Sequence, residues 1–117
     1  MEYLLLIHAE EAEGNTLSPG EMAERMAAYG AYTEALAKAG VMRGANRLRS
    51  ADTGTTVRLR SGKTEVLNGP YAETREQLGG YYLIDVPDLD TALAWAARCP
   101  GASHGTMEVR PIWPVVR

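Results

Sequence analysis

The chain is poor in residues that mark specialised proteins. Its single cysteine, Cys99, excludes an internal disulfide and a zinc site built from several cysteines. The segment around it, residues 97–100, is typical of a packed helix end rather than of a catalytic thiol. Lysine and arginine number 12 against 15 aspartates and glutamates, and the two signs are interspersed. The net charge of -3 therefore gives no basic surface for nucleic acid and no polybasic segment for anionic lipid.

Long hydrophobic runs and short catalytic motifs are also missing. The apolar opening, residues 1–8, is too short to cross a bilayer and lacks the basic region and cleavage site of a signal peptide. We therefore expect no membrane association and a cytoplasmic location. Metal-ligand spacing, a nucleophile elbow, a P-loop and a dinucleotide fingerprint are absent from the sequence. The sequence thus predicts neither a metal nor a cofactor.

What remains is the composition of one ordinary globular domain, residues 1–117, with 45% hydrophobic and 23% charged residues. The chain is large enough to bury a core and small enough that dimerisation would add useful burial. Its first apolar segment predicts a strand with two apolar faces, one carrying Tyr3, Leu5 and Ile7 and the other Leu4, Leu6 and His8. Since helices of so short a chain cover only one sheet face, a second copy is expected to cover the other. This strand therefore predicts a homodimer.

Two helices are predicted after a polar loop at residues 10–17. The first, residues 19–39, has Ser18 as N-cap and Glu21 completing a capping box, and Gly40 ends it. Its stripe is typical of packing on a sheet rather than of a cofactor site: Met22, Met26, Tyr29, Thr33 and Leu36. The second helix follows Asp88 as N-cap and stops at residues 99–101; its stripe is Leu89, Ala92, Leu93, Ala96 and Ala97.

Further strands are predicted by alternation and turn residues, at 41–49, 55–59, 64–67, 79–86 and about 105–112. The second and third of these form a hairpin around residues 60–63. Without the hairpin, the order is βαββαβ, a ferredoxin-like α+β fold with an antiparallel sheet and both helices on one face. Two such sheets packed face to face would form a dimeric α+β barrel.

One stretch resembles a known family. Residues 68–82, Asn-Gly-Pro-Tyr-Ala-Glu-Thr-Arg-Glu-Gln-Leu-Gly-Gly-Tyr-Tyr, resemble the signature of the YCII-related proteins of the DGPF subgroup, named for an Asp-Gly-Pro-Phe motif. The likeness continues through residues 85–88, 95–96, 99–101 and 105–112. It implies a bacterial ferredoxin-like domain that forms a dimeric α+β barrel. Members of the family are often described as enzymes with a His and Asp pair in a cleft, and a YCII-like dehydrochlorinase is a precedent for lyase chemistry. Some DGPF proteins are encoded near extracytoplasmic-function sigma factors.

The chain departs from the motif at two positions, with Asn68 for Asp and Tyr71 for Phe. Asn68 cannot ionise, so any proton transfer by the motif carboxylate is lost here. If the motif residue only fixes a turn, Asn serves equally well, and we favour that role.

The candidate catalytic residues are His8 and Asp85. His8 is the best general base near neutral pH, although a lone histidine on a strand is more often structural. Asp85 interrupts an apolar strand and is expected to need His8, Arg110 or a tyrosine as partner. His104, in a Ser-His-Gly loop, is expected to be exposed and is a weaker candidate than His8.

Candidate ligand-binding residues surround the signature. Tyrosine hydroxyls and an arginine suit a small carboxylated or phenolic molecule, and the candidates are Asn68, Tyr71, Glu73, Arg75, Tyr81, Glu108 and Arg110. Alternatively, residues 74–78 pack as a dimer-contact loop, and Glu108 with Arg110 forms a surface ion pair. The arginines at 43, 47 and 49 either bind an anion or form a solvated strand face, and the second is typical.

Two functions follow from these residues and the resemblance. The first is a homodimer that binds a small organic ligand in an inter-sheet cleft, with cofactor-free acid/base chemistry of a lyase-like kind. The alternative is a non-catalytic ligand-sensing or protein-partner module, for instance one acting with a sigma factor.

Overall fold

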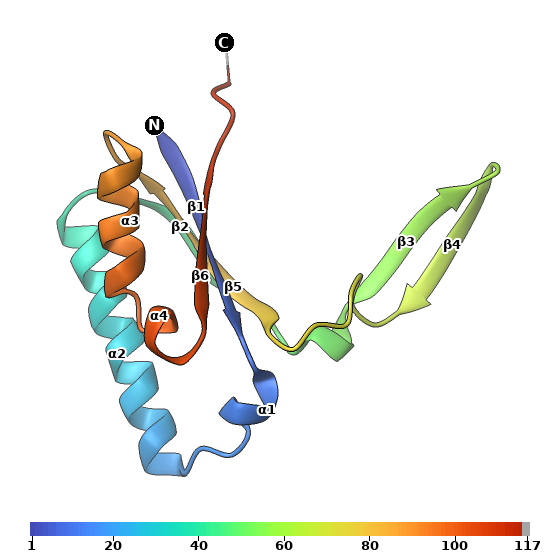
Figure 1. Ribbon diagram of the computed structural model, residues 1–117, viewed down its shortest axis with the longest axis horizontal. Helices are drawn as coiled ribbons and strands as arrows, with labels where there is room; N and C mark the ends of the chain where they lie inside the picture. The colour runs from blue at the N-terminus through green and yellow to red at the C-terminus, as the bar shows by residue number, and fades with distance from the viewer. Residues whose placement is uncertain (116–117) are drawn as a thin grey trace.

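The α+β prediction is confirmed by the computed structural model, which describes residues 1–115. A four-stranded sheet has the order β2-β5-β1-β6, with β1 (Glu2–Ala9), β2 (Met42–Arg47), β5 (Gln77–Asp85) and β6 (Thr106–Pro111). Every pair of neighbouring strands in it is antiparallel. Helices α2 (Pro19–Lys38) and α3 (Leu89–Arg98) lie on one face (Figure 1). This arrangement is compatible with a ferredoxin-like α+β fold.

The core lies between the sheet and these helices. As predicted, alternate residues of β1 point to it, and Leu5 is fully buried there against Ile84 of β5 and Leu36 of α2. The buried cluster is Tyr3, Leu5, Ile7, Tyr32, Leu36, Tyr82, Ile84, Val86, Ala92, Ala96 and Cys99. The other residues of the central strands form the opposite, helix-free face of the sheet, called here the open face.

Helix α2 begins and ends as its sequence predicts. The Ser18 side chain accepts a hydrogen bond from the Glu21 backbone N–H, and the Glu21 side chain accepts one from the Ser18 backbone N–H. At the other end, Gly40 has a φ of 72° just beyond the C-cap. Only its C-terminal half is buried, through Tyr32 and Leu36, and Tyr32 was not in the predicted stripe. Met26 belongs to the predicted stripe but remains 38% exposed. The N-terminal half of α2 therefore lacks a filled contact with the sheet.

Helix α3 is capped by Asp88, which accepts from the Thr91 backbone N–H at 2.8 Å. The predicted stripe is only half right, because Ala92 and Ala96 are buried whereas Leu89 and Leu93 are nearly half exposed. Two short helices were not predicted: α1 (Glu11–Gly14), within the expected loop, and α4 (Gly101–His104). Neither exceeds four residues, so no apolar periodicity marks them. No helix in residues 1–115 is long and apolar enough to span a membrane.

The predicted hairpin is present as β3 (Thr55–Arg60) and β4 (Lys63–Asn68), which follow a short 3₁₀ turn, η1 (Ala51–Thr53). Its turn has two residues rather than four: Ser61 and Gly62, with φ values of 51° and 76°. The hairpin stands away from the four-stranded sheet (Figure 1). Its apolar side chains are therefore exposed, namely Val57, Leu59, Val66 and Leu67.

Candidate functional site

His8 and Glu108 meet on the open face. Leu6 of β1 lies opposite Glu108 of β6, and His8 lies opposite Thr106, so the two side chains are diagonal neighbours across the strand pair. The His8 Nε2 atom is 3.0 Å from Glu108 Oε1. On its other side, Glu108 Oε2 accepts a hydrogen bond from Arg110 Nε at 2.9 Å. The ion pair predicted between Glu108 and Arg110 is thus part of a three-residue group with His8.

The charges of this group decide which ring nitrogen of His8 donates a hydrogen bond. Hydrogen bonding from His8, with Arg110 beside it, holds the pKa of Glu108 below its ordinary value. An ionised carboxylate only accepts hydrogen bonds, so the Nε2 of His8 must donate. In neutral His8 the lone pair then lies on Nδ1, for which residues 1–115 provide no hydrogen-bond partner. Carboxylate-oriented imidazoles of this kind act as general bases.

The segment after the hairpin closes one side of this group. Arg75 forms an ion pair with Glu10, while Glu76 accepts from the Thr106 hydroxyl at 2.8 Å. Gln77 fixes the end of the segment, because its side chain accepts from the Glu11 backbone N–H and donates to the Thr74 carbonyl. The segment held by these bonds borders an open cleft of about 520 Å³, called here the His8 cleft. The cleft is lined by His8, Glu10, Thr74, Arg75, Glu76 and Thr106.

Asp85 lies far from this cleft, and its predicted partners are wrong. It pairs with the Met1 amino group at 2.9 Å and with Arg43 at 3.8 Å, and the first contact lowers the pKa of its carboxyl. The register places Glu2 opposite Asp85, whereas His8 is six positions further along β1. Six residues of strand span about 20 Å. Asp85 therefore does not contact His8 within one chain, and its ion pairs are with Met1 and Arg43 rather than with Arg110.

The other predicted ligand residues are spread over three places. Tyr71 is 80% exposed, and Arg58 of the hairpin lies 5.6 Å from its ring centroid. Glu73 lines a separate shallow cleft beside α1, and Tyr81 accepts a hydrogen bond from Asn46 on the open face. Asn68 ends β4 opposite Thr55, and the left-handed backbone falls on Gly69, with a φ of 107°. Of this group, only Arg75 reaches the His8 cleft.

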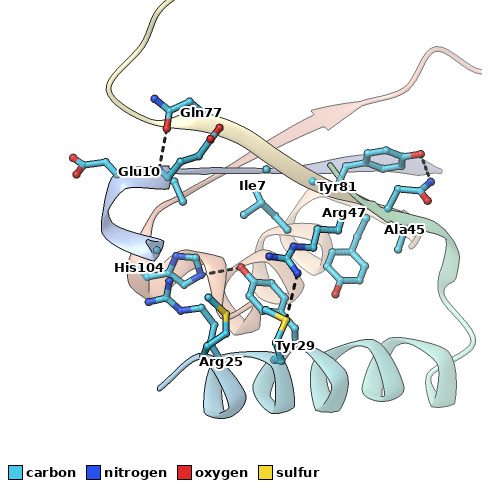
Figure 2. A pocket seen from close by; sticks show the side chains of 18 residues that line it. Ile7, Glu10, Arg25, Tyr29, Ala45, Arg47, Gln77, Tyr81 and His104 are labelled. Carbon is cyan, nitrogen blue, oxygen red and sulfur yellow. Dashed lines mark hydrogen bonds between the residues drawn. The ribbon is translucent and has the colours of Figure 1, made fainter. Parts of the chain in front are cut away.

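A second cavity lies on the opposite, helix-bearing side of the sheet, beneath the N-terminal half of α2 (Figure 2). Its volume is about 330 Å³, and most of its lining is apolar. Ile7, Ala45 and Tyr82 contribute from the sheet, and Met22, Met26 and Tyr29 from α2. The Tyr29 hydroxyl meets His104 Nε2 at 2.9 Å, so the expectation that His104 is simply exposed is wrong. We call this the α2 cavity.

Close backbone packing brings His104 to Tyr29. A Cβ at Gly105 would stand 2.2 Å from the His8 carbonyl oxygen, and one at Gly101 would stand 2.9 Å from Ile7 Cγ2. Glycine at both ends of α4 thus lets this helix lie directly on β1. Burial, with Arg25 nearby, lowers the pKa of His104, and burial raises the pKa of Tyr29 to about 12. Both groups are therefore neutral near pH 7.

One sign of this cavity is present in the sequence, the stripe of Met22, Met26 and Tyr29, but that stripe was interpreted as core packing. His104 and Arg47 were considered separately, as an exposed loop histidine and as one of three strand arginines. Their place at one cavity depends on α4 and on the direction of the Arg47 side chain, which the sequence alone does not show. The three arginines of that strand do not gather, since Arg43 pairs with Asp85 and Arg47 faces α2. No cluster of three metal-ligating side chains is found among residues 1–115.

The fold and these clefts define a small α+β domain that carries a group of polar side chains on the open face of an antiparallel sheet. The model of the YCII-related domain matches residues 1–116, and the chain therefore belongs to the YCII-related family. A protein of Rhizobium meliloti (strain 1021), described as uncharacterized, is 37% identical over 114 residues, which cover 96% of this chain and 92% of that protein. The predicted YCII-related family is thereby confirmed, whereas the DGPF subgroup stays a prediction.

Proposed function

We propose that this protein is a homodimeric small-molecule-binding protein of the DGPF subgroup, in which two open faces pack together and enclose a ligand beside His8. The centre of the open face supports the dimer, since it carries half-buried Leu4, Leu6, Tyr81 and Leu83 without covering helices. Its polar residues lie at the edge and ends of this apolar centre. A second sheet would therefore cover the apolar part and leave the His8 cleft as an inter-sheet opening.

The single observation that carries a chemical role is the 3.0 Å contact between His8 Nε2 and Glu108 Oε1. Glu108 orients the ring and leaves Nδ1 as the base, so Glu108 replaces Asp85 as the partner of His8 in the proposed mechanism. The base would take a proton from a carbon or oxygen acid and return it to the product or to water. Such a step needs no cofactor, and it suits the lyase-like chemistry that the family resemblance implies.

The cleft favours a small polar organic substrate. Arg75 lines it and Arg110 lies beside the His8 partner Glu108, although each cation already holds a glutamate, and Thr74 and Thr106 add hydroxyl groups. A carboxylate or phenolate of the ligand could share these cations without leaving a buried charge unpaired. A carbon acid that carries a carboxylate is therefore the proposed substrate class.

Deuterium exchange tests the base. A set of small carboxylated carbon acids is incubated with the protein in D₂O, and loss of C–H signals is followed by proton NMR. His8→Asn is expected to slow any catalysed exchange about 10²- to 10⁴-fold, the usual contribution of a general base. Glu108→Gln should also slow it, whereas Glu34→Gln on exposed α2, the same change of charge, should not. Undiminished exchange in His8→Asn would show that His8 is not the base.

The dimer is tested separately by light scattering at micromolar concentration. A dimer is expected for the wild-type chain, and Leu6→Glu, which places a charge in the apolar centre, should yield monomers. A monomeric wild type would remove the inter-sheet cleft from the proposal.

The exposed hairpin favours a second candidate function, that of a protein-partner module without catalysis. Its four large apolar side chains are each more than half exposed, and a two-stranded hairpin alone is marginally stable in water. Capture of a protein by the wild type that fails with Val57→Ser and Leu59→Ser, together with no exchange activity, would favour this function over the enzyme.

A further inference from the structure

The α2 cavity has the form of a ligand site that is separate from the His8 cleft. It lies on the other face of the sheet, and its volume of about 330 Å³ is at the small end of the range of small-molecule pockets, roughly 300–1,000 Å³. Gly79 and Gly80 line its floor, and Met22 and Met26 stand over it from α2. Methionine side chains adapt to different apolar shapes, so this wall suits a flexible fit to a ligand.

One of the lining residues of the cavity, Arg47, is a cation without an acidic partner among residues 1–115. Arg47 turns from β2 toward α2, where its Nη1 lies 3.7 Å from Met26 Sδ (Figure 2). A thioether sulfur is a weak acceptor for a guanidinium. Arg47 forms no ion pair with any of residues 1–115, whereas the neighbouring Arg25 is held by both carboxylate oxygens of Glu13.

The acids that line the cavity are already engaged at its other end. Glu10 pairs with Arg75, and Glu11 accepts from the Ala51 backbone N–H at 2.7 Å. Between the two ends, the Tyr29–His104 pair presents neutral polar groups, and His104 Nδ1 is buried without a partner among the described residues. Buried polar atoms without partners are rare and call for an explanation, and a functional site is one of those known.

We propose that the α2 cavity binds a small monocarboxylate with an apolar aromatic or aliphatic body, whose carboxylate is held by the Arg47 guanidinium. The apolar body fills the space between Tyr82 and the methionines, and the carboxylate replaces the sulfur as the acceptor for Arg47. A planar guanidinium accommodates a carboxylate with two parallel hydrogen bonds, which makes this exchange favourable.

Phenylacetate, with about ten non-hydrogen atoms, is a suitable probe, and phenylacetamide is its uncharged analogue. Chemical shifts of the ¹⁵N-labelled protein are followed during titration with each. Saturable binding of phenylacetate at millimolar concentration or below is expected, on the order of what a ligand of that size reaches, with shifts centred on Ala45, Tyr29 and Gly80. Arg47→Gln should weaken phenylacetate binding about tenfold or more and change phenylacetamide binding little.

Arg49→Gln is the matched control, because it removes the same charge two residues further along, on an exposed position that does not line the cavity. It should leave both affinities unchanged. Met22→Trp, which fills the cavity from α2, should abolish binding of both compounds, and a thermal melt would verify that this variant is folded. Equal effects of Arg47→Gln and Arg49→Gln, or shifts confined to the His8 cleft, would overturn the proposal. Because the variants leave His8 and Glu108 intact, their outcome is independent of the deuterium exchange experiment.

Discussion

Replacement of Gly105 by alanine should destabilise the protein through one backbone collision. The added Cβ would lie 2.2 Å from the carbonyl oxygen of His8 and 2.9 Å from Ala9 Cβ, whereas ordinary contacts begin near 3.4 Å. The oxygen belongs to the main chain of β1 and cannot rotate away, so β1 and the junction between α4 and β6 would have to separate by more than 1 Å. Overpacking of this kind costs roughly 1–3 kcal/mol, and a main-chain clash belongs at the upper end of that range.

Thermal unfolding measures this loss. For 117 residues the entropy of unfolding is about 0.25 kcal/mol/K, so a loss of about 3 kcal/mol should lower the Tm by roughly 12 °C. Gly30→Ala serves as the control, because it lies within α2 and no atom within 4 Å would meet its Cβ. That variant should raise the Tm by up to about 4 °C, since alanine favours helix by about 1 kcal/mol. An unchanged Tm for Gly105→Ala would mean that α4 does not lie on β1 as described.

Three further experiments test other parts of the structure. Leu36→Ala removes a fully buried side chain and should cost about 2–5 kcal/mol of unfolding free energy in urea, while Leu89→Ala, 47% exposed, should cost far less. The hydrogen bond from Arg25 lowers the pKa of Glu13, so this pair stabilises the fold above about pH 4.5. The stabilisation is lost as the pH falls through the lowered pKa, and Glu13→Gln should therefore remove this part of the pH dependence of the Tm. Burial raises the pKa of the Cys99 thiol, so iodoacetamide should alkylate it slowly in the native protein and rapidly in urea, and fast native alkylation would contradict its burial.

Local signals predicted the fold because each acts over a few residues. Ser18 and Glu21 form the capping box that their spacing indicates, and alternation along β1 assigns Leu5 to the core and His8 to the open face. The hairpin likewise follows from its turn residues. None of these predictions requires knowledge of distant parts of the chain.

The site was harder to predict because it depends on register and on helix placement. Alternation puts His8 and Asp85 on the same face, but only the pairing of β1 with β5 shows that they lie at opposite ends. Glu108 was recognised as polar lining, but its contact with His8 depends on the pairing of β1 with β6. The α2 cavity exists because the buried residues of α2, Tyr32 and Leu36, both lie in its C-terminal half, and a periodic stripe does not show where a helix leaves the sheet.

The two ends of the hairpin lie close together, so the segment from Thr55 to Asn68 can be deleted or replaced as a unit. The Gly69 backbone N–H donates to the Gly54 carbonyl at 2.7 Å, so the chain leaves and re-enters the domain at nearly the same point. A short loop joining these two glycines would therefore preserve the path of the chain on either side. An epitope, a fluorophore-binding hairpin or a longer ribbon could be inserted at this junction without altering the spacing between β2 and β5.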